Sequence, residues 1–434
     1  MKPLTALITA LALTAPLAGA QTQGGKLPPL PKDARVTITF YNYNLASAGI
    51  GAEGTRQLIA EFEALYPNIK VEGVASPSNE IIARLQADVV ARRTPDVAQI
   101  VFADMEFAIK NLGVKALEDL VPERELAAHF VGMHPRGRAL GLLEGKTWGI
   151  PYVFSTPVLF YNADLFRQAG LDPNRPPRTW AEVKTYALQI RNRTQKAGFF
   201  PAVYSPFDWM WQSFALSFGG RVMTQDRKQL TFAGEGGLSA VRMLRDLVDS
   251  GAHPNITAAD AQAAMAAGNL GMYLQTSALQ NFLLNSARGK YDLRSAQMPG
   301  TSPGRLSVPV NSGSGVFLMS NDPLKQRAGW ELIKFLTSNR GYTIITSKIG
   351  YVPLRDEAVK GEQFLAPWLR ENPIVSPNIE QLNRLSPWVP IPGQNYRQIT
   401  KLMMDAVEQA VLGKDDPAKV LRDAQERAQA LMPR

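Results

Sequence analysis

The sequence of 434 residues contains no cysteine. This absence excludes disulfide bonds, metal sites built on cysteine and thiol nucleophiles. It also excludes a lipid-modified cysteine at an export cleavage site. Only three histidines are present, at His129, His134 and His253, and they lack the spacing of metal ligands. We therefore expect neither a metal ion nor another cofactor.

Long hydrophobic runs are also scarce, and the one clear run lies near the N-terminus. Apolar residues fill positions 4–17, after the basic Lys2 and before the small residues Ala18-Gly19-Ala20. This pattern predicts a signal peptide over 1–20, cleaved after Ala20, rather than a buried first helix, and hence export to the periplasm. A flexible leader is expected over 21–34. No other run of about 20 apolar residues follows, so the protein is not expected to be embedded in a membrane.

Enzyme motifs are missing as well. No phosphate-binding or dinucleotide-binding glycine loop is found. The sequence nearest to a nucleophile elbow, residues 312–315, lacks the first glycine. A secreted carbohydrate-active hydrolase stays open as an alternative, because a glycosidase needs only two carboxylates. The candidate site residues below are mostly hydroxyls, amides and aromatics, which favours binding over catalysis, so we expect no enzyme.

The charge is basic but dispersed. Lys and Arg together number 47 and Asp and Glu 38, for a net charge of +9. No block of basic residues with interleaved aromatics occurs, so solvated basic surface is favoured over a nucleic-acid site. An anionic small ligand is compatible with this charge.

Hydrophobic periodicity alternates between strand and helix over the first hundred residues. Strands are predicted at 36–41, 69–74 and 97–102, with an amphipathic helix from Thr55 and another around 81–89. Such alternation predicts a parallel sheet with right-handed crossovers. Ligands bind beyond the carboxyl ends of the strands in sheets of this kind.

Polar and aromatic residues follow these strand ends. Tyr41 and Tyr43 offer a ring and a hydroxyl for a polyol, although a cluster at a strand end can be purely structural. Ser78 follows the second strand. Asp104 follows the third, where its carboxylate could accept two sugar hydroxyls or instead cap a helix.

The length predicts two lobes rather than one core. Three segments are expected to cross between them, at 149–161, 308–319 and 350–353, so that each lobe is discontinuous and can rotate about the crossings. We expect a monomer, with lobe 1 formed by 35–158 and 312–350, and lobe 2 by 159–311 and 351–434.

The most informative stretch is 155–180. A strand, a short helix, a glycine stop, a proline-rich turn and the helix-capping Thr179 follow one another there. This stretch resembles bacterial extracellular solute-binding proteins of ABC importers (family 1, carbohydrate type), and within them the glycerol-phosphate binders. Thr94-Pro95-Asp96, Gly350-Tyr351-Val352-Pro353 and the chain from Trp388 onward support the resemblance.

The resemblance implies an α/β fold of the two-lobed periplasmic binding protein type (type II, maltose-binding-protein-like), with discontinuous lobes and three crossings. It implies capture of a sugar or glycerol phosphate in the interlobe cleft. The ligand would be delivered to permease subunits in the membrane, driven by a cytoplasmic ATPase.

It also implies the binding residues. Hydrogen bonds are expected from Ser155 and Tyr351, and stacking from Trp209 or Trp211, for which core packing is the alternative. The phosphate-binding arginine of the family is replaced by Ile391, which leaves Arg397 as the candidate cation. The full set of expected ligand contacts is Tyr41, Tyr43, Ser78, Asp104, Ser155, Trp209, Trp211, Thr276, Ser277, Ser312, Gly313, Tyr351 and Arg397. Within it, residues 312–315 could be a hinge instead.

Overall fold

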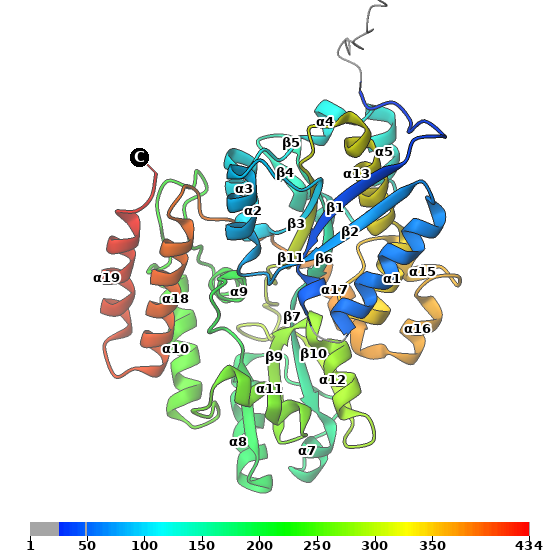
Figure 1. Cartoon of the computed structure of the whole chain (residues 1–434). Helices are drawn as coiled ribbons and strands as arrows, with labels where there is room; N and C mark the ends of the chain where they lie inside the picture. The colour runs from blue at the N-terminus through cyan, green and yellow to red at the C-terminus, as the bar shows by residue number, and fades with distance from the viewer. Residues whose placement is uncertain (1–25, 48–49, 434) are drawn as a thin grey trace, which may run out of the picture.

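The computed structural model describes residues 26–47 and 50–433, in which two main β-sheets lie one above the other (Figure 1). The predicted signal peptide and residues 21–25 of the leader lie outside these residues. The first sheet has the order β2-β1-β3-β11-β6 and the second the order β10-β7-β9-β8. The strands are β1 (Val36–Asn42), β2 (Ile69–Ala75), β3 (Val97–Val101), β6 (Gly149–Ser155), β7 (Pro157–Asn162), β8 (Ala197–Pro201), β9 (Leu270–Thr276), β10 (Leu293–Gln297) and β11 (Ser312–Leu318); β4 (Leu142–Leu143) and β5 (Lys146–Thr147) form a small hairpin.

The first three strands confirm the predicted parallel unit. β1 pairs in parallel with both β2 and β3. β11 then runs antiparallel between β3 and β6. The helices of this half are α1 (Ile50–Leu65), α2 (Ile81–Val90), α3 (Met105–Asn111), α4 (Leu117–Leu120), α5 (Glu123–Phe130), α6 (Pro135–Arg138), α13 (Pro323–Leu336) and α14 (Asn339–Ile344).

The first crossing differs from the prediction of one long strand over 149–161. β6 belongs to the first sheet and β7 to the second, and only Thr156 separates them. Thr156 is completely buried, and its hydroxyl donates to Asn378 Oδ1 at 2.7 Å. Its backbone N–H donates to Ser277 Oγ at 3.2 Å. These contacts hold the crossing against the second half of the molecule.

In the described residues, five helices pack around the second sheet. They are α7 (Ala163–Gln168), α8 (Trp180–Thr194), α11 (Ala258–Ala266), α12 (Gln280–Ala287) and α17 (Ser376–Gln381). The predicted start of α8 is confirmed, because Thr179 and Glu182 form a reciprocal capping box. Between the halves, α15 (Asp356–Lys360) and α16 (Ala366–Glu371) follow the last crossing.

A helical layer flanks the space between the two sheets (Figure 1). Its members are α9 (Trp209–Ser217), α10 (Glu235–Asp249), α18 (Tyr396–Leu412) and α19 (Pro417–Gln429). α18 packs on both α10 and α19. The side chain of Asp416 accepts from Ala418 N, so Asp416 is the N-cap of α19 and Pro417 follows at the first helical position. None of the helices in the described residues is long and apolar enough to cross a membrane.

Candidate functional site

A cavity of about 440 Å³ lies between the two halves. One wall is the turn after β3, with Ala103 and Asp104. The opposite wall is the loop 204–208, and one face of α18 closes a third side. Its volume is within the range of small-molecule sites. Four aromatic side chains line it, those of Tyr204, Phe207, Trp388 and Tyr396.

Two residues expected at the site, Asp104 and Arg397, meet in this cavity. Arg397 Nη2 lies 2.9 Å from Asp104 Oδ2, and Arg397 Nε lies 3.2 Å from Oδ1. The hydroxyl of Tyr396 also donates to Asp104. Although burial opposes a charge on Arg397, the adjacent Asp104 raises the pKa of the guanidinium. Asp104 is therefore the anionic partner of Arg397 and not a free acceptor for sugar hydroxyls.

The backbone of Asn79, the residue after Ser78, ties Arg397 to the first half as well. Arg397 Nη1 donates to the carbonyl of Asn79 at 2.9 Å, and the partly exposed Ser78 precedes that residue. The guanidinium therefore already has partners for several of its five donors. Three of its five N–H groups are engaged in this way, which leaves two for a ligand.

A second acid, Asp208, fixes the aromatic Trp388. Asp208 Oδ1 accepts from Trp388 Nε1 at 2.8 Å, and Oδ2 accepts from Gln212 Nε2 at 2.8 Å. Burial raises the pKa of Asp208, and no cation pairs with it among the described residues. Phe207 meets the Trp388 ring edge-on, with ring centroids 5.9 Å apart. The two rings form a rigid aromatic corner of the kind on which the C–H face of a sugar stacks.

The charges of α18 add no free cation to the cavity. Lys401 pairs with Asp405 at 2.7 Å, as Arg397 pairs with Asp104. Glu408 also lines the cavity, and no ion pair involving it is formed within the described residues. Both basic side chains of the cavity are thus compensated, and the acids outnumber them.

A buried polar cluster lies where the sheets join. The backbone N–H of Tyr43 donates to Gln99 Oε1 at 3.1 Å, and Gln99 Nε2 donates to Ser314 Oγ at 2.8 Å. Burial raises the pKa of Tyr43 to about 12, although Ser314 and Tyr351 lie close enough to its hydroxyl to oppose this shift. Tyr43 and Tyr351, both expected at the site, are therefore brought together here.

The remaining expected residues of the crossings gather around Thr156. Ser155 is opposite Ser312 in the β6–β11 pairing. The side chain of Thr276 caps Ala278 N, and Ser277 Oγ holds the backbone of Thr156. Ser155 and Ser277 are both buried. The expected residues near the crossings do not line the 440 Å³ cavity; they are Ser155, Thr276, Ser277, Ser312 and Gly313.

Three of the expected residues lie away from the 440 Å³ cavity. The Tyr41 hydroxyl donates to Asp88 Oδ2 at 2.7 Å beneath α2, so Tyr41 serves the core of the first half. Trp211 is completely buried, with its ring against Gly237. Trp209 is 6% exposed and does not line the cavity. Neither tryptophan offers a ring to a ligand in this structure.

Phe207, Trp388, Tyr204 and Tyr396 were not predicted as site residues. Phe207 and Tyr204 flank the sequence Ser-Pro, which signals an irregular loop able to present side chains. Tyr396 and Arg397 begin a helix, where Thr400, Met404 and Glu408 repeat every four residues. That periodicity marks one face of α18, but it does not reveal what the face contacts.

Within the described residues, no group of His, Asp and Glu side chains could hold a metal ion.

Comparison with known proteins gives a family match over most of the chain. The family "Bacterial extracellular solute-binding protein" matches residues 57–374. The sn-glycerol-3-phosphate-binding periplasmic protein UgpB of Escherichia coli O1:K1 is 29% identical over 205 residues, which cover 46% of this chain and 43% of that protein.

Solved structures share the fold. UgpB from Mycobacterium tuberculosis, in complex with glycerophosphocholine, has a TM-score of 0.78 at 21% identity, covering 91% of this chain and 98% of that one. The cyclic alpha-maltosyl-1,6-maltose binding protein from Arthrobacter globiformis has a TM-score of 0.77 at 21% identity, covering 92% and 99%. The two-lobed maltose-binding-protein-like α/β fold expected from the sequence is confirmed.

Proposed function

Because the chain belongs to the bacterial extracellular solute-binding proteins, we propose that it captures an uncharged, polyhydroxylated solute, a sugar, in the cavity between its lobes. It then delivers the solute to the permease of an ABC importer. The relatives that bind sugars or glycerol phosphates support both ligand classes. The observation that supports a sugar over a phosphate is the pairing of Arg397 with Asp104.

A phosphate ligand needs an uncompensated cation, because arginine recognises phosphate through charge-assisted, bidentate hydrogen bonds. In the cavity, Arg397 and Lys401 each already face a carboxylate. Glu408, which forms no ion pair within the described residues, would oppose an incoming anion. A sugar, by contrast, can stack on the corner of Phe207 and Trp388 and donate a hydroxyl to Glu408.

Movement of the lobes would couple binding to delivery. We propose that the lobes rotate about the three crossings, near residues 155–157, 311–312 and 350–352, and that ligand stabilises the closed form through its differential affinity for it. The lobes are those given above for the sequence, except that residues 352–360 are reassigned to lobe 1. Segment 352–360 contacts residues 131–138, as in the bond from His134 N to Leu354 O at 2.8 Å, so it moves with lobe 1 in this proposal.

The proposed role in an ABC importer also implies where the protein acts. We propose that residues 1–20 are removed after Ala20 and that the protein acts in the periplasm. N-terminal sequencing of the protein from a periplasmic extract should begin at Gln21. A mature chain that retains residues 1–20 in the cytoplasm would contradict this proposal.

A thermal-shift screen tests the ligand class. Glycerol-3-phosphate, a glycerophosphodiester, and mono- and disaccharides are compared on the mature protein. A ligand at 100 times its Kd adds about 2.7 kcal/mol to the stability, which is an easily measured shift. A shift with a sugar and none with glycerol-3-phosphate is expected. A shift only with the phosphate would overturn the assignment.

A turnover assay tests the hydrolase alternative. Asp104 and Asp208 are the carboxylates that a glycosidase would use here, and both are engaged in structural hydrogen bonds. We expect no hydrolysis of chromogenic glycosides by the wild type. A rate that Asp104→Ala or Asp208→Ala abolishes would establish the enzyme instead.

A further inference from the structure

A second, smaller cavity of about 190 Å³ lies beside the first. Its walls are almost entirely apolar, and several of them belong to buried side chains. The residues that shape it are Phe102, Met105, Leu140, Leu142, Val389 and Pro390. Like the main cavity, it lies between the halves, because Phe102 and Leu140 belong to the first half and the segment 387–390 comes from beyond the last crossing.

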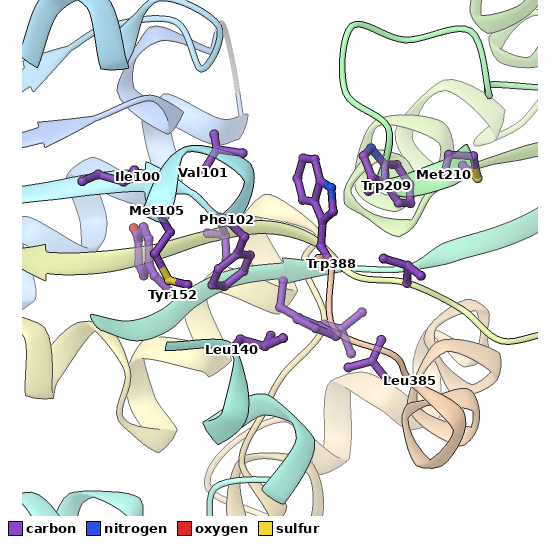
Figure 2. Close-up of a cluster of buried hydrophobic side chains, with 14 of the residues drawn as sticks. Ile100, Val101, Phe102, Met105, Leu140, Tyr152, Trp209, Met210, Leu385 and Trp388 are labelled. Carbon is purple, nitrogen blue, oxygen red and sulfur yellow. The ribbon is translucent and has the colours of Figure 1, made fainter. Parts of the chain in front are cut away.

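Trp388 is common to the two cavities. Its indole N–H is held by Asp208 on the side of the polar cavity. In Figure 2 the Trp388 ring stands between the group of Phe102 and Met105 on one side and Trp209 on the other. The turn 102–105 also borders both cavities, since Asp104 lines the first and Phe102 the second. The two cavities are therefore neighbours that have the Trp388 side chain as a common wall.

Among the described residues, the lining of the apolar cavity contains no charged side chain that lacks an ion-pair partner. Its one charged wall residue is Arg227. The guanidinium of Arg227 is paired with the buried Glu106 and donates to the carbonyl of Pro390 at 2.8 Å. With that charge compensated, the cavity selects for an apolar group. Enclosed apolar cavities of similar size accept molecules such as benzene, and this cavity, which is partly open at Leu142, has the same kind of lining.

We propose that the transported solute carries an apolar substituent, a short alkyl or aryl group, which occupies this second cavity while its hydroxylated part occupies the first. This inference rests on the proposed function and narrows the substrate class from sugars to glycosides of apolar alcohols or phenols. Trp388 sets the specificity for the solute. Its ring separates the cavity for the hydroxylated part of the solute from the cavity for the apolar substituent.

The test uses 1-hexanol and a series of methyl, butyl and hexyl β-D-glucosides, with binding measured by calorimetry. Each buried methylene is expected to strengthen binding by about fourfold until the cavity is full. Leu142→Gln makes one wall polar and should weaken hexanol binding roughly fivefold or more. Leu142 is 41% exposed, so this change is tolerated by the fold.

The matched control is Leu324→Gln, at a leucine 45% exposed and away from the cavity, which should change nothing. Ala139→Phe, at an exposed wall position, fills the cavity and should exclude hexanol. Hexanol that fails to bind, or that binds all variants equally, overturns the proposal. A sugar that binds while its alkyl glycosides bind no more tightly also overturns it, and leaves the proposed function intact. Hexanol binding that Leu142→Gln weakens, without binding of any sugar, supports the cavity but contradicts the proposed function.

Discussion

Arg397 Nη2 and Asp104 Oδ2 lie 2.9 Å apart although 293 residues separate them in the chain. The pair joins the end of β3 to the start of α18. Asp104 is completely buried, whereas the side chain of Arg397 is 41% exposed. The cation best placed to recognise a phosphate is therefore already compensated by an acid that cannot move into water.

Asp104→Asn should increase the affinity of the cavity for anionic ligands. The substitution keeps the size of the side chain but removes the negative charge, so that the Arg397 guanidinium becomes available. Hydrogen bonds to charged groups contribute roughly 1.5–3 kcal/mol, so the affinity for glycerol-3-phosphate should rise by about tenfold or more. Isothermal titration calorimetry at a fixed ionic strength measures this change.

Asp405→Asn is the control for that experiment. It frees the exposed Lys401 in the same cavity and leaves the Arg397 pair intact. An exposed lysine is strongly screened, so little gain in phosphate affinity is expected. If the wild type binds glycerol-3-phosphate tightly and Asp104→Asn weakens that binding, the compensation argument is wrong.

The local patterns of the sequence predicted the elements well but not their long-range pairing. The parallel unit of β1, β2 and β3 follows from periodicity, and the start of α8 from the capping box at Thr179. Asp104 and Arg397 were each expected at the site, yet their neutralisation of one another depends on a contact that no local pattern encodes. The break at Thr156 was also invisible, since buried strands of two different sheets form one continuous apolar run.

The tryptophans show a second limit. α9 is buried on nearly all sides, so its sequence has no polar face that would reveal which residues point to the cleft. Trp209 and Trp211 are buried in the core. The rings at the cavity are those of Phe207, two residues before the start of α9, and of Trp388, which is far along the chain.

Phe207→Ala should weaken sugar binding without unfolding the protein. Phe207 is partly exposed and packs edge-on against Trp388 at the cavity. Removal of an aromatic anchor of this kind costs roughly 1–3 kcal/mol of binding free energy. Calorimetry with the sugar found by thermal shift gives the affinity, and thermal denaturation of the free protein gives the stability.

Trp211→Phe separates binding from folding in the same region. Because Trp211 is completely buried, its replacement should lower the thermal stability and leave the sugar affinity nearly unchanged. The opposite pattern, with affinity lost in Trp211→Phe and kept in Phe207→Ala, would return the stacking role to α9.

His129 should make the protein less stable in mild acid. Burial lowers the pKa of His129 to about 3, and Arg355 and Lys334 act in the same direction against the nearby Glu125. Below pH 6.5 the unfolded chain therefore binds a proton that the folded chain does not, so the free energy of unfolding falls with pH from about 6.5 toward 3. The loss should be on the order of 1 kcal/mol per pH unit.

The measurement compares denaturant unfolding of the wild type and His129→Asn between pH 7 and pH 5. This range avoids Glu125: burial would raise its pKa, but Arg327 and Lys334 hold it at about 2, so its contribution is lost only at lower pH. The variant should be less stable than the wild type at pH 7, because it loses the bond to Thr337 Oγ1, but its stability should depend less on pH. Parallel pH curves would show that His129 is protonated in the folded protein.

Gly313→Ala should damage the second crossing more than any exposed loop substitution. Gly313 has φ +117°, a region that residues with a Cβ rarely adopt, and a Cβ there would lie 2.0 Å from the carbonyl oxygen of Val153 on β6. The obstacle is backbone, which cannot rotate away, so the pairing of β11 with β6 must shift. Strain and displacement together should cost about 3 kcal/mol or more of stability.

Gly304→Ala is the matched control, since Gly304 also has a positive φ of +80° but no atom within 4 Å of the added Cβ. This substitution should cost about 1 kcal/mol of stability. Equal losses in chemical denaturation would show that the close approach of the strands is not required, and that these crossing strands can separate without unfolding either lobe.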